Sequence, residues 1–357
     1  MGDRVLLLGS VPLDSAEQVF QVSCEVLGDL LPSVTDGEVG DRLWWHNYTA
    51  YNTFSTHPDV ETLARPAPVH GLPAWKPESL EDMWSFRIRP GVTSLRFDSL
   101  GYVEPAVTSY RHFSRLRREG VIPAGLRFQV CLPMTGSGCD TFFRDPADVT
   151  RVHAAYEEAM IREVNGLTAA IPHEDLAIQW DLCVEVLDIE GALPWTDPSA
   201  RFERNVEPIG RLAPHVPEDV ILGYHFCSGT LGGWPMVPSA DAGTFVRLCN
   251  AAVDLSGRRV DYVHFPAPRR RADDSYFAPL TGLRTGPTRV YLGLVHHTEG
   301  RDVEGFLQRY RAASRYLRDF GIASVCGYGR VSHGEVREVL ETHRLNAEAM
   351  LAAGVAR

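Results

Sequence analysis

The sequence predicts a single domain, residues 1–357, folded as an α/β barrel of eight parallel strands, the (β/α)8 or TIM barrel. Short apolar runs bounded by turn residues alternate with longer segments of helical periodicity, a pattern typical of repeated β/α units around a parallel sheet. A length of 357 residues lies within the range of single barrels of this kind. Eight such runs are present, and eight parallel strands close into a barrel.

The predicted strands are short and rich in aliphatic side chains, as buried parallel strands usually are. In chain order they are expected at Val5–Ser10, Ser33–Glu38, Leu126–Leu132, Leu176–Val184, Val220–Cys227, Val260–Phe265, Arg289–Val295 and Ile322–Cys326.

Helical segments are expected between these strands and after the last of them. Two have clear start signals. Asp145 precedes Pro146, which suits the first helical position, and Ser332 is followed three residues later by Glu335, as in a capping box. The predicted helices are Ser15–Leu31, Pro105–Glu119, Ala147–Leu167, Ala200–Leu212, Ala240–Leu255, Val303–Phe320 and Ser332–Ala352.

Residues 41–101 interrupt the second β/α unit as a long insertion rich in Trp, His and Pro, with the pair Trp44-Trp45 near its start. An extra strand is expected at Ser94–Leu100. Loops after barrel strands build the mouth of the barrel, so this insertion is interpreted either as a lid over the site or as an extra hairpin packed on the rim.

Charge and composition exclude several classes of function. The chain carries 35 basic and 46 acidic side chains, a net charge of −11, which argues against a nucleic-acid partner. The basic cluster Arg269–Arg271 is followed by Asp273 and Asp274, which favours a solvated loop over an anion site. The apolar runs are too short for a membrane span or a signal peptide, so we expect a cytoplasmic protein without membrane contact. Seven scattered cysteines fit reduced thiols rather than a disulfide framework.

Reactive side chains stand at the C-terminal ends of the predicted strands, where barrel enzymes carry their catalytic groups. These residues are far apart in the sequence, yet a closed barrel would bring them around one opening. They are Ser10, Glu38, Asp181, His225 with Cys227, His264, His297 and Cys326.

Three of these residues form a candidate metal site. His225 and Cys227 are two positions apart on one strand, so alternation places both side chains on the same face. Cys326 ends the last strand and supplies a second thiol. Zn²⁺ favours such nitrogen and sulfur ligands, and three protein ligands leave a fourth position open for catalysis. The other interpretation is structural, with cysteines packed as small apolar residues and the histidine as a core residue. Cys183, on the same face as Asp181, is assigned to neither interpretation.

In this order, the strand ends resemble the catalytic barrel of the cobalamin-independent methionine synthase family from Leu8 to Arg330, nearly the whole chain. His225-Phe226-Cys227 resembles the zinc-binding His-x-Cys motif of the family, and Val325-Cys326-Gly327 resembles its Asp-Cys-Gly motif. The matching segments are Leu8-Gly9-Ser10-Val11-Pro12, Asp36-Gly37-Glu38, Ile178-Gln179-Trp180-Asp181, His225-Phe226-Cys227 and Val325-Cys326-Gly327.

The resemblance implies a zinc-dependent methyl or alkyl transferase, in which a zinc-bound thiolate takes the methyl group of a folate. It further implies that Ser10, Glu38 and Asp181 hold the amino-acid part of a substrate. His297 matches a strand-end histidine that assists proton transfer to the leaving group, with a one-residue gap that leaves His296 as an alternative. We therefore expect a small substrate, either a thiol or an amino-acid-like compound, with folate as one candidate methyl donor.

Two positions depart from the family pattern. The glutamate ligand of the family falls on Pro266, which cannot bind zinc, and His264, two residues earlier, is a candidate substitute. Leu182 stands where the family has a further acid. We expect this protein to lack the second, N-terminal barrel of the full-length enzymes. A metal-independent lyase or decarboxylase, similar in fold to uroporphyrinogen decarboxylase, and a non-catalytic homologue are the alternative interpretations.

Overall fold

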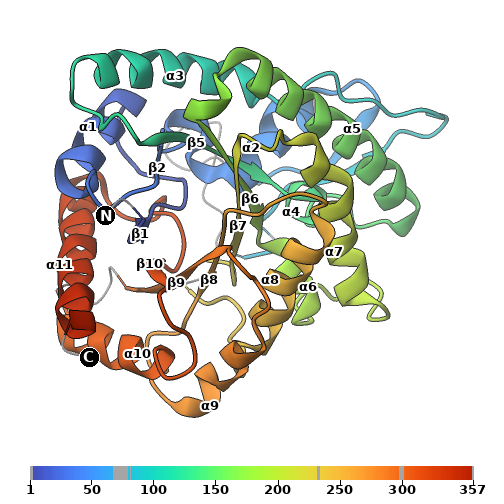
Figure 1. Cartoon of the computed structure of the whole chain (residues 1–357). Coiled ribbons are helices and arrows are strands. Elements are labelled where there is room, and N and C mark those ends of the chain that lie inside the picture. Colours follow the sequence, from blue (N-terminus) through green and yellow to red (C-terminus); the bar gives the residue numbers. More distant parts are fainter. Residues whose placement is uncertain (1–2, 67–78, 81, 231–233, 297–300, 356–357) are drawn as a thin grey trace.

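The computed structural model describes residues 3–66, 79–80, 82–230, 234–296 and 301–355. In these residues eight parallel strands form one sheet, in the order β1-β10-β9-β8-β7-β6-β5-β2. Helices surround the strands as an outer ring (Figure 1). The backbone N–H of Val11 donates to the carbonyl of Gly37 at 2.8 Å, which links the segments that follow β1 and β2, the two ends of the sheet. The predicted barrel of eight parallel strands is confirmed.

Each predicted strand overlaps one strand of the barrel, although the hydrogen-bonded ladders are shorter than several of the apolar runs. The barrel strands are β1 (Val5–Leu6), β2 (Ser33–Thr35), β5 (Arg127–Pro133), β6 (Leu176–Leu182), β7 (Ile221–Phe226), β8 (Tyr262–Pro266), β9 (Arg289–Val295) and β10 (Gly321–Ser324).

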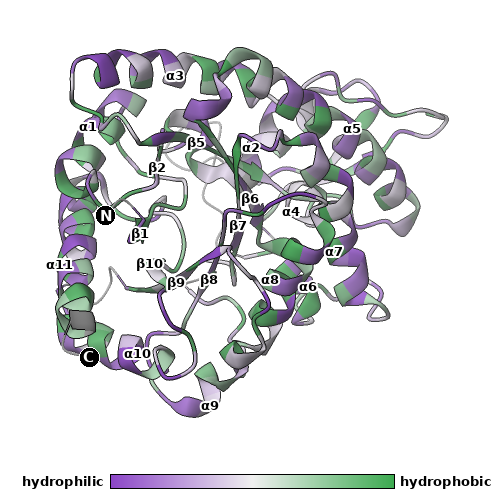
Figure 2. Ribbon diagram, in the orientation of Figure 1, coloured by the Kyte–Doolittle hydropathy of each residue, from purple (hydrophilic) through white to green (hydrophobic). Residues whose placement is uncertain are grey.

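The predicted helices are present with modest changes in their bounds. They are amphipathic, and Figure 2 shows hydrophobic and hydrophilic residues mixed along the outer ring. No helix in the described ranges combines the length and the apolar character that a membrane span requires. The helices are α1 (Ala16–Leu27), α2 (Trp45–Asn52), α3 (Val103–Arg118), α4 (Thr135–Cys139), α5 (Pro146–Ala170), α6 (Val184–Ile189), α7 (Arg201–Leu212), α8 (Gly243–Leu255), α9 (Asp274–Phe277), α10 (Val303–Ala313) and α11 (Val336–Val355).

Both predicted helix starts are capped. The Asp145 side chain accepts from the Ala147 N–H at 2.9 Å. Ser332 and Glu335 form a capping box at the 3₁₀ turn that leads into α11.

Two helices end earlier than the sequence pattern predicts. Helix α1 ends at Leu27, not Leu31, because the Leu30 carbonyl accepts from the backbone of β1, with the Val5 N–H at 3.1 Å. Helix α10 ends at Ala313, where the Ser314 hydroxyl donates to the Tyr310 carbonyl at 2.7 Å. The apolar residues beyond each helix end pack against the rest of the protein and do not extend the helix.

The predicted strand at Ser94–Leu100 is wrong. The insertion instead forms an antiparallel hairpin of β3 (Val60–Ala64) and β4 (Ser85–Ile88). The backbone N–H groups of residues 100–103 donate to the carboxylate of Glu163 on α5, at 2.6 to 3.1 Å. A carboxylate, rather than a neighbouring strand, therefore satisfies this buried backbone.

The hairpin packs on the rim of the barrel through a cluster of phenylalanines. Phe54 lies 5.8 Å from Phe86 and 5.1 Å from Phe143, measured between ring centroids. The Phe86 N–H donates to the Phe142 carbonyl, between α4 and α5, at 2.9 Å. The hairpin is thus part of the packed structure beside the barrel mouth.

Inside the barrel, side chains change from apolar to polar along the strands. Leu6, Tyr262 and Tyr291 pack together near the N-terminal ends. One layer further, the Tyr262 hydroxyl donates to Gln179 Oε1 at 3.1 Å, and Gln179 Nε2 donates to Asp181 Oδ1 at 2.8 Å. Tyr262, Gln179 and Asp181 thus form a chain of buried hydrogen bonds that runs toward the mouth of the barrel. This chain fixes the orientation of Asp181.

Candidate metal centre

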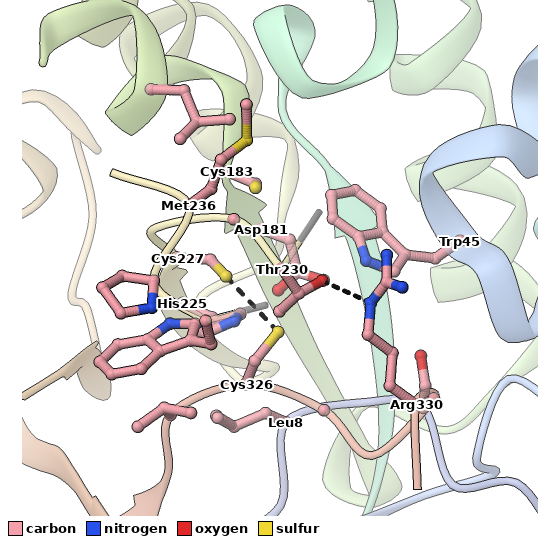
Figure 3. A pocket seen from close by; sticks show the side chains of 18 of the residues that line it. Leu8, Trp45, Asp181, Cys183, His225, Cys227, Thr230, Met236, Cys326 and Arg330 are labelled. Atoms are coloured by element: carbon pink, nitrogen blue, oxygen red, sulfur yellow. Dashed lines mark hydrogen bonds between the residues drawn. The ribbon is translucent and has the colours of Figure 1, made fainter. Parts of the chain in front are cut away.

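A cavity of about 640 Å³ opens at the C-terminal ends of the barrel strands. Figure 3 shows His225, Cys227, Cys326 and Asp181 around this space, on segments that are distant in the sequence. The structure thus brings most of the candidate residues together. Those in the cavity wall are Ser10, Glu38, Asp181, His225, Cys227 and Cys326.

His225, Cys227 and Cys326 form the tightest group. One ligand atom from each lies within 4.8 Å of the others, and the Cys227 and Cys326 sulfurs are 3.4 Å apart. Two sulfurs bound to one tetrahedral zinc are separated by about 3.8 Å, given zinc–sulfur bonds of about 2.3 Å. The spacing of the two thiols therefore fits a shared zinc ion after a small adjustment.

The two thiols are protonated in the absence of a cation. The adjacent Cys183 thiol, together with burial, raises the pKa of Cys227 well above its usual range. The Cys227 thiol and burial do the same for the pKa of Cys326. A bound cation reverses this preference because it stabilises the thiolates, so metal binding would release protons here.

His264 lies beside this group rather than in it. Its Nε2 is 3.1 Å from the Ser324 carbonyl, which can only accept, so Nε2 carries the proton. Burial lowers the pKa of His264 well below its usual range, which keeps the ring neutral and leaves Nδ1 as an acceptor. His225 Nδ1, 2.7 Å from that atom, must then be the donor. In the neutral ring, Nε2 of His225 then carries the lone pair that a metal ligand requires.

This arrangement uses both ring nitrogens of His264 in contacts within the protein. The residue that sequence comparison offers as a replacement for the missing glutamate is thus placed to orient His225. Pro266, at the glutamate position, ends β8 and offers no side-chain donor atom.

A second group, at the bottom of the cavity, contains two buried carboxyl groups. Glu38, Cys131 and Asp181 have ligand atoms within 4.8 Å of one another, and the Ser10 hydroxyl donates to Glu38. Burial raises the pKa of Glu38 to about 7. Burial and the charge of Glu38 raise the pKa of Asp181 well above its usual range. A cationic ligand such as an ammonium group would stabilise the ionised forms of both carboxyl groups and lower their pKa values, so the pair favours a ligand of this kind.

The backbone holds Glu38 in an unusual conformation. Its φ is +51°, in the left-handed region that non-glycine residues seldom adopt. The Glu38 N–H donates to Asp36 Oδ1 at 2.9 Å, and the Asp36 carboxylate is in turn paired with Arg42 at 2.7 Å. Strain of this kind is found where a side chain must be aimed at a site, here the floor of the cavity.

Replacement of Glu38 by glutamine is expected to stabilise the protein at alkaline pH. The pKa is about 4.5 for an ordinary glutamate and about 7 here, so the folded state binds the proton more tightly. Stability contributed by Glu38 is therefore full at low pH, falls as the pH rises from about 4.5 to 7, and is constant above. Relative to wild type, Glu38→Gln should gain about 2 to 3 kcal/mol in unfolding free energy between pH 5 and pH 8. Urea unfolding at the two pH values measures this; an equal difference at both would contradict it.

Two histidines, His297 and His296, are predicted for proton transfer. His297 lies outside the described residues. His296 lines the cavity, its Nε2 is 3.0 Å from the Ala267 carbonyl, and its ring is 5.7 Å from that of Trp234.

Sequence reasoning missed Arg330 in the cavity wall. Arg330, four positions after Cys326, has its Nε donating to the Thr230 hydroxyl at 3.1 Å and its guanidinium 5.7 Å from the Trp44 ring. Trp44 and Trp45 come from the start of the insertion, which therefore does contribute to the mouth. The short spacing from Cys326 was the available signal for Arg330. Arg269 and Arg270, interpreted as a solvated loop, are exposed and stand at the edge of the same cavity.

Comparison with known proteins gives no match to a family model and none to a curated protein. Solved structures do match. A B12-independent methionine synthase from Shewanella sp. W3-18-1, in complex with selenomethionine, aligns over 100% of both chains with a TM-score of 0.61 and 14% identity. The fold is that of the B12-independent methionine synthases.

Two further structures agree. A putative vitamin-B12 independent methionine synthase from Listeria monocytogenes aligns over 92% of this chain and 86% of its own, with a TM-score of 0.56 and 15% identity. A methyltransferase from Methanosarcina mazei aligns over 98% of this chain and 95% of its own, with a TM-score of 0.57 and 12% identity. At sequence identities of 12 to 15%, these similarities establish a shared fold and nothing more specific.

Proposed function

We propose that this protein is a zinc-dependent methyl or alkyl transferase that acts on a thiol. The observation that carries the proposal is the convergence of His225, Cys227 and Cys326 at one barrel mouth, with their ligand atoms within 4.8 Å. The fold shared with methionine synthases and a methyltransferase supports the same class of reaction.

The donor set suits zinc. Two thiols and a neutral imidazole are ligands that Zn²⁺ prefers, and the His225–His264 hydrogen bond fixes the tautomer that binding needs. When bound, zinc would hold an acceptor thiol as its thiolate at neutral pH, a strong nucleophile toward a methyl group.

The remaining residues would position the acceptor. Glu38 and Asp181 offer negative charge to an ammonium group, and the Ser10 hydroxyl adds a polar contact beside Glu38. An amino acid that carries a thiol satisfies both groups at once, with its amine at the carboxylates and its sulfur at the trio. We therefore propose an amino-acid-like thiol as acceptor, of which homocysteine is one example.

Methyl transfer forms a bond between the acceptor sulfur and the methyl carbon as the bond to the leaving atom of the donor breaks. That atom keeps the electron pair and takes a proton, for which His297 remains the predicted source. Indole rings, proline rings and aliphatic side chains make up much of the cavity wall. This wall would exclude water and suit a flat donor, and folate is the donor that we would test first.

A zinc-reconstitution assay tests the proposal. We expect about one zinc per purified chain, and loss of methyl transfer from methyltetrahydrofolate to thiols, with homocysteine included, after treatment with a chelator. Zinc should restore the activity, whereas magnesium should not, since magnesium prefers oxygen ligands. Wild-type protein that takes up no zinc under reducing conditions would contradict the proposal.

A lyase or decarboxylase that works without metal is the second candidate. It is favoured by Pro266, which removes the expected carboxylate ligand, and by the carboxyl group of Glu38, whose pKa of about 7 suits an acid or base at neutral pH. Loss of CO₂ from a carboxylated substrate that continues in excess chelator would favour this function over the transferase.

A further inference from the structure

The trio supplies three zinc ligands, and the fourth position is the open question of the site. Resting zinc sites in proteins are usually four-coordinate, with the last ligand from the protein or from water. Pro266 cannot contribute, and His264 uses both nitrogens elsewhere. A fourth ligand from the protein would therefore have to come from the end of another strand.

Cys183 stands at the right height along the barrel. In the ladder between β6 and β7, Asp181 pairs with His225 and Leu182 pairs with Phe226. The Cys227 N–H also donates to the Leu182 carbonyl at 3.0 Å. The register thus brings Cys183 opposite Cys227, one residue beyond the end of each strand.

The Cys183 thiol faces the metal side of the cavity. It lines the cavity and is partly exposed. Figure 3 shows the thiols of Cys183, Cys227 and Cys326 along one side of the space. The backbone of Cys183 is fixed, since its N–H donates to the Ser137 hydroxyl at 2.9 Å.

We propose that Cys183 is the fourth zinc ligand of the resting protein, which makes the site Cys₃His. This inference rests on the proposed zinc function and adds a residue to it. The sulfur lies outside the 4.8 Å group formed by the trio. Ligation would therefore require the sulfur to move toward the trio, by rotation about the Cα–Cβ bond of Cys183. A thiolate from β6 would then replace the carboxylate that the family resemblance places on β8.

Sulfur counting on the zinc-loaded protein tests this inference without an activity assay. X-ray absorption at the zinc edge should give three sulfurs and one nitrogen in wild type, and two sulfurs in Cys183→Ser. Zinc affinity, measured by competition with a chromophoric chelator, should fall at least about tenfold, because even loss of a group that only orients a ligand costs 10- to 100-fold. Cys24→Ser, on α1, is the matched control and should resemble wild type.

Two different results would contradict the inference about Cys183 and the proposed zinc function. Two sulfurs in wild type, with the same count and affinity in Cys183→Ser, would overturn the role of Cys183 and leave the zinc transferase standing. Wild type that binds no zinc would overturn the proposed function, and Cys₃His coordination with it.

Discussion

Replacement of Cys227 by serine is expected to remove zinc from the purified protein and to reduce methyl transfer to background. Cys227 is buried, its sulfur lies 3.4 Å from that of Cys326, and it stands one residue beyond β7, in the same group of ligand atoms as His225. A serine hydroxyl stays protonated at neutral pH and is a poor zinc ligand, so one thiolate would be left beside the imidazole. Affinity should fall more than about 100-fold, beyond the effect of losing an orienting group. Cys326→Ser should behave in the same way.

Metal analysis and the chelator competition measure this effect. Cys24→Ser provides the control, because it makes the same chemical change at a buried thiol on α1, outside the cavity wall. Far-ultraviolet circular dichroism should show that all three variants are folded. A full zinc complement and unchanged affinity in both Cys227→Ser and Cys326→Ser would rule out the trio as the metal site.

Replacement of Asp181 by asparagine is expected to lower kcat/KM for an amine-bearing thiol by about 100-fold. The substitution preserves the shape and the acceptor for Gln179 Nε2, which donates to the carboxylate at 2.8 Å, but it removes the charge. A buried charged contact to a ligand is worth about 3 kcal/mol, which corresponds to about 100-fold. A thiol of the same length without the amino group should lose little.

The comparison of the two acceptors is the decisive readout. Asp175→Asn is the matched control: Asp175 is also buried, but it precedes β6 at the opposite end of the barrel and pairs with Arg117. Its replacement should not change the preference for the amine. If Asp181→Asn reduced kcat/KM equally for both acceptors, Asp181 would have a structural role and the acceptor would not be held by its ammonium group.

Much of the barrel could be predicted because its signals are local. Each strand is marked by a short apolar run, and the alternation of β-structure explains why His225 and Cys227 face the same side. The predicted strand at Ser94–Leu100 failed for the opposite reason. Its apolar side chains Phe97 and Leu100 are buried by packing, and the Leu100 N–H donates to the carboxylate of Glu163, more than sixty residues away. Sequence periodicity carries no record of such a partner.

The eight β/α units and the placement of reactive residues at strand ends follow from local sequence patterns, because hydrophobic periodicity and chain direction are properties of short segments. How these residues combine depends on the folded structure. The approach of Cys227 to Cys326, 99 positions away, the hydrogen bond that sets the tautomer of His225, and the position of Cys183 beside Cys227 all depend on strand register and barrel closure. Those are long-range properties, set by the packing of the whole chain.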